Sequence, residues 1–218
     1  MRQPRFDAFQ DGFSGVVLRL IQTQLRPPSL SGGVDRGPAV LSEWAARSFV
    51  ASLALYDTFV AATGRAEGFT LKWPNDVRVN KAKLSGILIE TGQDAQGFWV
   101  IAGMGVNVAQ VPPEAGQAAT CLADLSGMQA LDHIDVFGSL TRHFMTRLAQ
   151  ARDGFGPVRT DWLKRAEGLG GMVRVSPGGV AIEGIFEDMA PDGGLILRLP
   201  DGSRQTIRAG DVHLIGEV

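Results

Sequence analysis

The sequence contains very little of what disulfide-bonded, zinc-binding or membrane proteins need. It has one cysteine, Cys121, in 218 residues, so an internal disulfide is excluded and no neighbouring cysteine or histidine gives the spacing of zinc ligands. The histidines, His133, His143 and His213, are far apart in the sequence, and we expect each to be structural or exposed. No run of about eighteen apolar residues is present, which predicts no membrane-spanning helix.

The charges are balanced, which removes an electrostatic reason to expect nucleic acid or a membrane surface as the main partner. Lys and Arg total 21, Asp and Glu total 23, and the net charge is −2. Hydrophobic residues make up 44% of the chain, which is enough to bury the core of one or two domains. The single cysteine and the lack of an apolar leader after Met1 predict a cytoplasmic protein.

Hydrophobic spacing predicts helices packed against a sheet. From Ser42 to Gly64, apolar residues recur every three or four positions, which indicates an amphipathic helix with a cap at each end. Residues 134–148 and 157–166 show the same spacing, and a short helical turn is expected around residues 121–125. The pattern predicts an α+β fold with a mainly antiparallel sheet. Its strands are expected at residues 69–73, 77–79, 84–90 and 98–108, with a hairpin turn at residues 92–97.

A second, smaller unit is predicted after the glycine-rich segment 168–171. Pro-Gly and Asp-Gly turns separate short strands there, and this pattern is typical of a small β-barrel. The beginning of the chain fits neither unit, although residues 12–25 are apolar enough for one strand or helix. We therefore divide the chain into an atypical N-terminal segment with no assigned function, a larger α+β unit and the small β unit. Their bounds are residues 1–42, 43–168 and 169–218.

The most informative stretch is residues 71–90, LKWPNDVRVNKAKLSGILIE. It places two lysines, an amide and a carboxylate around one turn between apolar strands. Pro74 has no backbone N–H, so strand pairing should stop there, and Asn75 and Asp76 are expected in the turn. Lys83 opens the next buried strand. Taken alone, Lys83 would be interpreted as an exposed surface lysine.

Three blocks in order, KWPND, KLSGILIE and GMGVNV at residues 103–108, resemble the catalytic domain of bacterial biotin protein ligases. The resemblance begins near Ala46 and continues to the C-terminus. It implies a biotin/lipoate ligase-like sheet with packed helices, followed by an SH3-like β-barrel. It also implies a reaction in which biotin and ATP form biotinyl-5′-AMP, and a lysine of a biotin carboxyl carrier protein then takes the biotinyl group. The implied cofactors are ATP and Mg²⁺, with biotin as substrate, and a homodimer is left open.

The resemblance assigns the central role to Lys83. This residue matches the family lysine that bridges the biotin carboxylate and the phosphate, so it is the catalytic residue and a biotin contact. A fixed cation there would reduce the repulsion between two anionic reactants. Gly86 and Gly103 are the other implied biotin contacts, since a residue without Cβ lets the backbone approach a ligand closely.

The nucleotide contacts implied by the resemblance are polar. Asn75 and Asp76 offer oxygen atoms suited to Mg²⁺ carried by ATP phosphates, with Asp76 as the metal ligand. Asn107 resembles the family asparagine near the nucleotide. An alternative role for Asp76, orientation of the incoming lysine amine, stays open from the sequence.

One part of the family pattern is missing. Family members carry upstream a loop of the form GRGRRGR that closes over biotin and its adenylate, and the nearest segment here, SLSGGVDRGP at residues 29–38, has a different spacing. A frame or start error would produce such a sequence. Two alternatives to an active biotin ligase therefore remain: a degenerate, non-catalytic ligase-like binding protein, or a lipoyl or other acyl ligase of the same class.

The remaining polar residues receive simpler interpretations. Trp73 and Pro74 are expected to be core and turn residues, and Lys72 a solvated lysine. Arg142 and Arg147 are interpreted as a solvated helix face. No role is assigned to the arginines of the small β unit, Arg198, Arg204 and Arg208.

Overall fold

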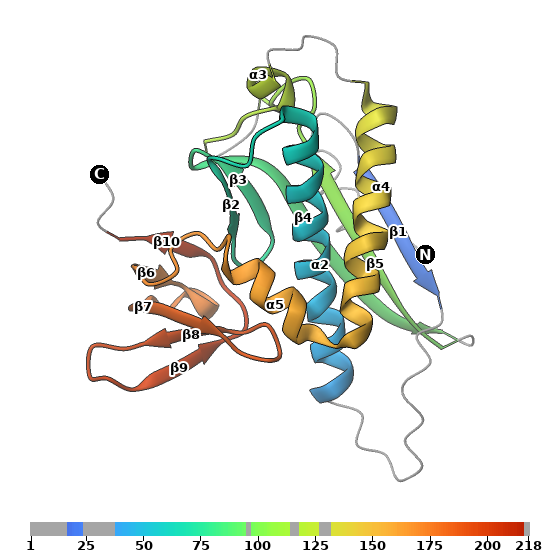
Figure 1. Ribbon diagram of the computed structural model, residues 1–218. Helices are drawn as coiled ribbons and strands as arrows, with labels where there is room; N and C mark the ends of the chain where they lie inside the picture. Colours follow the sequence, from blue (N-terminus) through green and yellow to red (C-terminus); the bar gives the residue numbers. More distant parts are fainter. Residues whose placement is uncertain (1–16, 24–37, 95–96, 114–117, 127–131, 216–218) are drawn as a thin grey trace.

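The computed structural model describes residues 17–23, 38–94, 97–113, 118–126 and 132–215 (Figure 1). Two five-stranded antiparallel sheets dominate it, one in each part of the chain. The first sheet has the strand order β1-β5-β4-β3-β2. Its strands are β1 (Val17–Thr23), β2 (Phe69–Lys72), β3 (Asp76–Val79), β4 (Ala82–Asp94) and β5 (Gly97–Val106).

Helices cover one face of the first sheet, as Figure 1 shows. The long α2 lies between the sheet and α4, so its residues from Val50 to Leu55 are almost completely buried on all sides. A helix that is apolar around its whole circumference is expected in such a position. The helices are α2 (Pro38–Thr63), α3 (Leu122–Ser126), α4 (His133–Gln150), the short 3₁₀ helix η1 (Ala151–Asp153) and α5 (Phe155–Leu163).

The predicted helices are present, with shifted boundaries. α2 ends where expected, because Gly64 has a φ of +69° and its N–H donates to the Val60 carbonyl at 2.8 Å. The expected start at Ser42 was wrong, since α2 already begins at Pro38. Proline is tolerated in the first turn of a helix, where its missing N–H would have no intrahelical partner.

The strands of the first sheet are longer than predicted at the β4–β5 hairpin. A turn was expected at residues 92–97, but Gly92 pairs with Trp99 and Asp94 pairs with Gly97. That expectation was therefore wrong, because polar residues continue the ladder wherever the partner strand still offers its backbone groups. The apolar segment near the N-terminus forms the strand β1, which pairs with β5 at the edge of this sheet. The boundary drawn at residue 42 consequently does not separate residues 17–23 from the sheet.

The core lies between the first sheet and α2. Side chains alternate along each strand, and the helix-facing set is buried and apolar. Leu71 pairs with Val77 and Ile87 pairs with Met104, and all four are 1% exposed or less. The opposite face of the same strands carries polar residues and glycines, and it is therefore where a ligand can lie.

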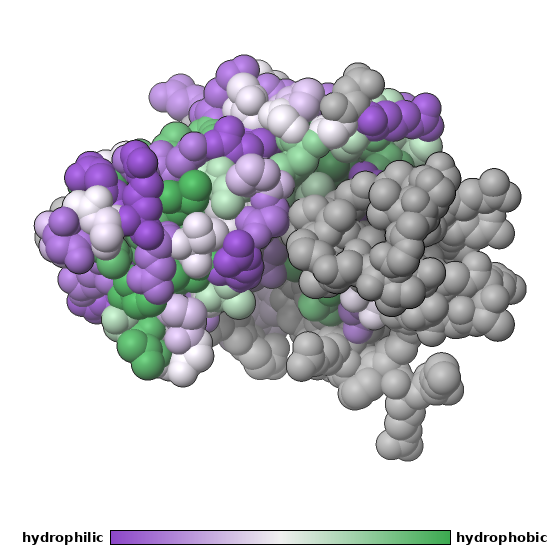
Figure 2. Space-filling view, turned by 90° about the horizontal axis from the view of Figure 1, so that it is seen from below, coloured by the Kyte–Doolittle hydropathy of each residue, from purple (hydrophilic) through white to green (hydrophobic). Residues whose placement is uncertain are grey.

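The second sheet, with order β10-β6-β7-β8-β9, confirms the small C-terminal β domain. Its charged residues pair mainly with one another: Arg204 donates to Glu187 through two nitrogens, and Arg208 donates to Asp192 at 2.7 Å. Figure 2 shows hydrophilic residues over much of this domain, at the left of the view. The elements are β6 (Met172–Val175), η2 (Pro177–Gly179), β7 (Ile182–Met189), β8 (Leu195–Arg198), β9 (Arg204–Ile207) and β10 (Val212–Leu214).

The two parts of the chain are joined by specific contacts. The Leu71 N–H donates to the Arg165 carbonyl at 2.8 Å, and the Glu167 N–H donates to the Leu71 carbonyl at 2.9 Å, so the connecting segment pairs with β2. The Trp73 indole N–H donates to the Gly193 carbonyl at 3.0 Å, across to the C-terminal domain. Trp73 is 3% exposed, which confirms its interpretation as a core residue.

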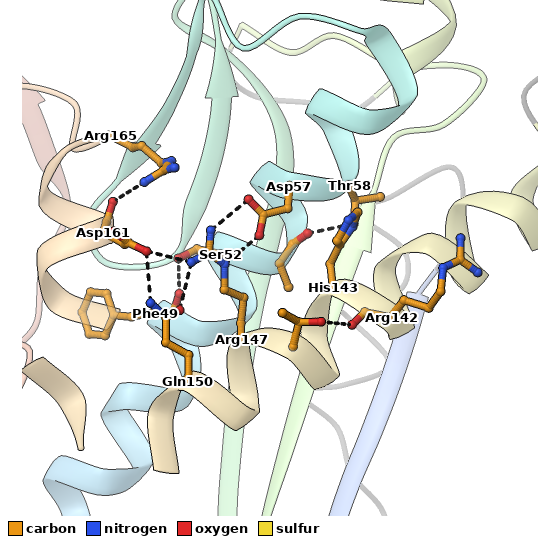
Figure 3. Close-up of polar contacts among 12 residues, drawn as sticks. Phe49, Ser52, Asp57, Thr58, Arg142, His143, Arg147, Gln150, Asp161 and Arg165 are labelled. Carbon is orange, nitrogen blue, oxygen red and sulfur yellow. Dashed lines mark hydrogen bonds and ion pairs between the residues drawn. The ribbon is translucent and has the colours of Figure 1, made fainter. Parts of the chain in front are cut away.

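The interpretation of Arg147 as part of a solvated helix face was wrong. Arg147 donates to both Asp57 carboxylate oxygens, at 2.6 and 3.0 Å, and to Asp161 at 2.8 Å (Figure 3). Its side chain is 13% exposed. The pKa of Asp161 is lowered to about 2 by hydrogen bonds from Gln150 and Arg147. A single arginine thus ties α4 to α2 and α5, which sequence spacing along one helix does not reveal.

Replacing Arg147 by Met should reduce the free energy of unfolding by about 2–4 kcal/mol at pH 7, because two partly buried carboxylates lose their cation. Since the folded-state pKa of Asp161 lies below its ordinary value of 3.8, its stabilising contribution is present above that pH and is lost as the pH falls toward about 2. The difference between variant and parent should therefore shrink in acid. Urea unfolding at pH 7 and pH 3 tests this, with the exposed Arg142→Met as control; an equal loss for both variants would contradict it.

Candidate active site

The polar face of the first sheet gathers the residues that the sequence singled out. In the ladder Lys72 lies opposite Asp76, and Asp76 lies opposite Gly86. One strand further, Gly86 lies opposite Gly105, and Leu88 lies opposite Gly103. Directly opposite residues share a face, so Asp76, Gly86 and Gly103 all lie on the side away from the helices.

A β-bulge brings Lys83 onto the same face. In a regular strand Lys83 would share a face with Ile87, whose side chain is buried under the helices. The register shifts by one residue between Val77 and Arg78, so that Arg78 lies opposite Lys83 rather than Leu84. Bulges often re-aim a side chain next to a functional site. Here the bulge puts Leu84 in the core and Lys83 on the polar face.

Lys83 and Asp76 form an ion pair at the centre of this face. The Lys83 ammonium lies 2.7 Å from a carboxylate oxygen of Asp76, and the two side chains are 22% and 12% exposed. Partial burial strengthens this attraction relative to a surface pair and limits the positions that the lysine can take. Lys83 is therefore not the exposed surface lysine that a reading of this residue alone would favour.

The backbone of Lys83 is held on both sides. Its N–H donates to the Ala118 carbonyl at 2.8 Å, and its own carbonyl accepts from the Thr120 N–H at 3.0 Å. Lys83 therefore lies between β3 and an extra bridge to Ala119. A backbone fixed in this way places the ammonium with little freedom, as a preorganised site requires.

Asn75 closes the turn before β3. Its side-chain amide donates to the Ile87 carbonyl at 2.8 Å, and the Ile87 N–H donates to the Asn75 carbonyl at 2.9 Å. These bonds fix the turn against β4 and leave the side-chain oxygen of Asn75 as an acceptor. Asp76, which was expected in the turn, is instead the first residue of β3, and its place in the ladder determines its direction.

Asn107 lies beyond the end of β5 and is 2% exposed. Its side-chain amide donates to the Thr120 carbonyl at 3.2 Å, and its backbone carbonyl accepts from the Leu122 N–H at 3.0 Å. Its Oδ1 is buried and has no hydrogen-bond partner among the described residues. An acceptor left without a partner in a buried position is unfavourable in the absence of a ligand.

Other predicted features lie elsewhere or outside the described residues. The segment at residues 29–37, compared above with the family loop, is outside them. Within the described part of the chain, no group of three or more His, Cys, Asp or Glu residues can hold a metal ion. No helix in that part is long and apolar enough to cross a membrane. His143 bonds to the Thr58 hydroxyl at 3.2 Å between α4 and α2, which confirms a structural role.

Sequence reasoning missed three residues of the polar face. Lys72 was treated as solvated, and Arg78 and Glu167 were given no role. Arg78 lies opposite both Thr70 and Lys83 in the ladders, and it forms an ion pair with Glu167 at 2.5 Å. Asp76 and Arg78 are two positions apart in one strand, and this spacing indicated that both lie on the same face. Nothing in the sequence indicated that Glu167 approaches them from the connecting segment.

Two protein-family models match the two parts of the chain. A family model described as "Biotin/lipoate A/B protein ligase family" matches residues 37–164, and one described as "Biotin protein ligase C terminal domain" matches residues 168–214. The chain therefore belongs to the biotin protein ligase family.

Two relatives and one solved structure indicate which biotin ligases this chain resembles. The biotin–[acetyl-CoA-carboxylase] ligase of Paracoccus denitrificans is 40% identical over 176 residues, which are 78% of this chain and 72% of that protein. The ligase of the same name from Mycobacterium tuberculosis is 36% identical over 188 residues, 85% and 68% of the two chains. The apo structure of the biotin protein ligase from Aquifex aeolicus has the same fold, with a TM-score of 0.71 at 23% identity, covering 91% of this chain and 80% of that one.

Proposed function

We propose that this protein activates biotin with ATP to form biotinyl-5′-AMP and pyrophosphate, and then transfers the biotinyl group to a lysine of a biotin carboxyl carrier protein. The observation that carries the proposal is the partly buried Lys83–Asp76 pair, placed by a bulge on the ligand-accessible face of the sheet. The similarity to two biotin–[acetyl-CoA-carboxylase] ligases supports the choice of substrates.

Lys83 supplies positive charge where two anions react. The biotin carboxylate attacks the α-phosphate of ATP, and pyrophosphate leaves. Repulsion between these groups falls when a cation with restricted motion lies between them, and the effect is larger where water is excluded. No covalent intermediate with the protein is required. The later attack of the carrier lysine on the mixed anhydride is accelerated chiefly by positioning.

The glycines of the polar face provide room for biotin. Gly86 and Gly103 lie on the same side of β4 and β5 as Lys83, and both are buried. A Cβ at either position would point toward the ligand side of the sheet. We place the biotin ring system along these glycines, with its carboxylate directed to Lys83.

The polar groups fit a nucleotide with its magnesium ion. One carboxylate, Asp76, and one amide oxygen, from Asn75, suit an Mg²⁺ that is bound mainly by phosphate oxygens, but they are too few for a site made of protein alone. When bound, the ion would supply charge neutralisation for the phosphates. The buried Oδ1 of Asn107 would accept a hydrogen bond from the nucleotide. The proposal also includes ATP as the cosubstrate and a carrier protein as the partner. It places the protein in the cytoplasm.

Biotin-dependent exchange of labelled pyrophosphate into ATP tests this function. We expect exchange with biotin and ATP that stops when biotin is omitted, together with labelling of an apo carrier domain. Exchange with lipoate instead of biotin would identify a lipoyl ligase. Silence with both acids, in protein that is folded by circular dichroism, would overturn the proposal in favour of a non-catalytic relative.

A further inference from the structure

A polar cavity lies beside the candidate active site, at the junction of the two domains. It has a volume of about 330 Å³. We call it the junction cavity. Its lining comes from the β2–β3 hairpin and the turn after it, from the segment connecting the domains, and from β10. The lining residues are Lys72, Arg78, Lys81, Glu167, Val212, His213 and Leu214.

The junction cavity is cationic. Three of its side chains carry a positive charge, and the single carboxylate, Glu167, is already engaged. One Glu167 oxygen accepts from Arg78 at 2.5 Å, and the other accepts from the Thr70 hydroxyl at 2.8 Å. Glu167 is 8% exposed and therefore neutralises Arg78 locally. The charge of Lys72 remains in excess over the acidic groups that line the cavity.

Two groups in the lining lack hydrogen-bond partners among the described residues. The Nε of Arg78 is buried and has none. The ammonium of Lys72, on the same face, makes no hydrogen bond or ion pair with the described residues. A buried donor without a partner is costly, and an ammonium beside it favours an anionic ligand. An entering carboxylate would pair with the Lys72 ammonium and lie beside the Arg78 guanidinium.

The cavity lies next to the proposed reaction centre, on the side away from Asn107. Lys72 is directly opposite Asp76 in the ladder, and Asp76 pairs with Lys83. In the sheet order, β4 lies between β5, which leads to Asn107, and β3 with β2, which carry Arg78 and Lys72. Asn107 and the junction cavity therefore lie on opposite sides of Lys83.

We propose that the junction cavity binds an acidic side chain of the carrier protein near the lysine that receives biotin. This inference rests on the proposed function, since only the second step of that reaction involves a protein. The acceptor lysine must reach the same face of the sheet. A carboxylate held by Lys72 and Arg78 would anchor the carrier within a few residues of that lysine, and opposite charges would also steer its approach.

A triphosphate is a poorer match to this cavity. Glu167 lies in its wall and Asp76 lies directly opposite Lys72 in the ladder, so a highly charged anion would meet two carboxylates. A single side-chain carboxylate is matched by one ammonium and one guanidinium N–H. Charge complementarity therefore favours the carrier over the nucleotide.

The experiment compares Lys72→Glu with the parent protein in both half-reactions. The probe is the apo biotinyl domain of Paracoccus denitrificans acetyl-CoA carboxylase. We expect the KM for this domain to rise at least about tenfold, as for loss of a close charge pair at an interface, while biotin-dependent pyrophosphate exchange changes less than about threefold. When one acidic residue of the probe is changed to lysine (Glu→Lys or Asp→Lys), the Lys72→Glu enzyme should biotinylate this changed probe with most of the efficiency that it lost on the original. The parent enzyme should use the changed probe poorly.

Arg142→Glu is the matched control, because it reverses an exposed cation on α4, which lies with the helices on the opposite side of the sheet. An equal rise in KM for this control would show an effect of net charge alone and would overturn the proposal. If Lys72→Glu lowers pyrophosphate exchange as much as it lowers transfer to the carrier, the cavity belongs to ATP and the proposal is overturned. An unchanged KM of Lys72→Glu for the carrier domain would also overturn it. If the parent shows no exchange, the proposed function fails. Binding of the probe to the parent and to Lys72→Glu is then measured directly by titration. Equal affinity of the two proteins for the probe overturns the inference.

Discussion

Replacing Lys83 by Ala is expected to lower biotin-dependent pyrophosphate exchange by roughly two to four orders of magnitude, by comparison with the loss of other preorganised charge-stabilising groups. The physical reason is the place of the ammonium. The Lys83 side chain is 22% exposed and lies on the only face of the first sheet that the described helices leave open. Loss of this charge leaves two anionic reactants without their nearest cation, while the backbone bonds of residue 83 to Ala118 and Thr120 should remain.

The control for this variant is Lys164→Ala. Lys164 directly follows the end of α5, its side chain is 65% exposed, and its ion pair with Asp161 at 3.3 Å is a surface pair of small energetic value. We expect its exchange rate to stay near that of the parent. The unfolding midpoints of both variants should be measured, because Lys83→Ala also leaves Asp76 without its partner. An exchange rate for folded Lys83→Ala within about threefold of the parent would remove Lys83 from the proposed mechanism.

The elements of the fold could be predicted because their patterns are local. The spacing of apolar residues located α2, α4 and α5, and the turn residues located the strands of both sheets. Helix starts and hairpin ends were less accurate. α2 begins four positions earlier than the cap at Ser42 suggested, and β4 continues to Asp94, because tertiary packing and ladder pairing extend elements beyond their local signals.

The candidate site could be predicted only in part. The sequence pointed to Lys83 and Asp76, but alternation alone would have placed Lys83 on the helix side of β4. The bulge that turns it depends on pairing with β3, which is a property of two strands rather than one. The partner of Arg78, Glu167, is 89 positions away in the sequence, and no local pattern connects them. The same holds for Arg147 and Asp57, which are 90 positions apart.

The carboxylate of Asp76 contacts Lys83 and also faces the proposed site of the nucleotide. Its ion pair with Lys83 at 2.7 Å orients the ammonium before substrates bind. A carboxylate in this position is also the strongest ligand that the site offers to a magnesium ion on ATP. Because one carboxylate cannot hold two cations as closely as it holds either one, Asp76 would hold Lys83 less closely if it also held a magnesium ion carried by ATP.

Asp76→Asn should therefore lower pyrophosphate exchange by roughly two orders of magnitude, a size typical of losing one preorganised electrostatic group. The substitution keeps the shape of the side chain and removes its charge. It should also raise the Mg²⁺ concentration for half-maximal exchange several-fold, because a neutral amide is a weaker ligand for this ion. Titration of the exchange rate with Mg²⁺ at saturating ATP measures both effects, with Asp201→Asn, at an exposed turn of the C-terminal domain, as control. A lower rate with an unchanged Mg²⁺ requirement would limit Asp76 to the orientation of Lys83 and contradict its assignment as a metal ligand.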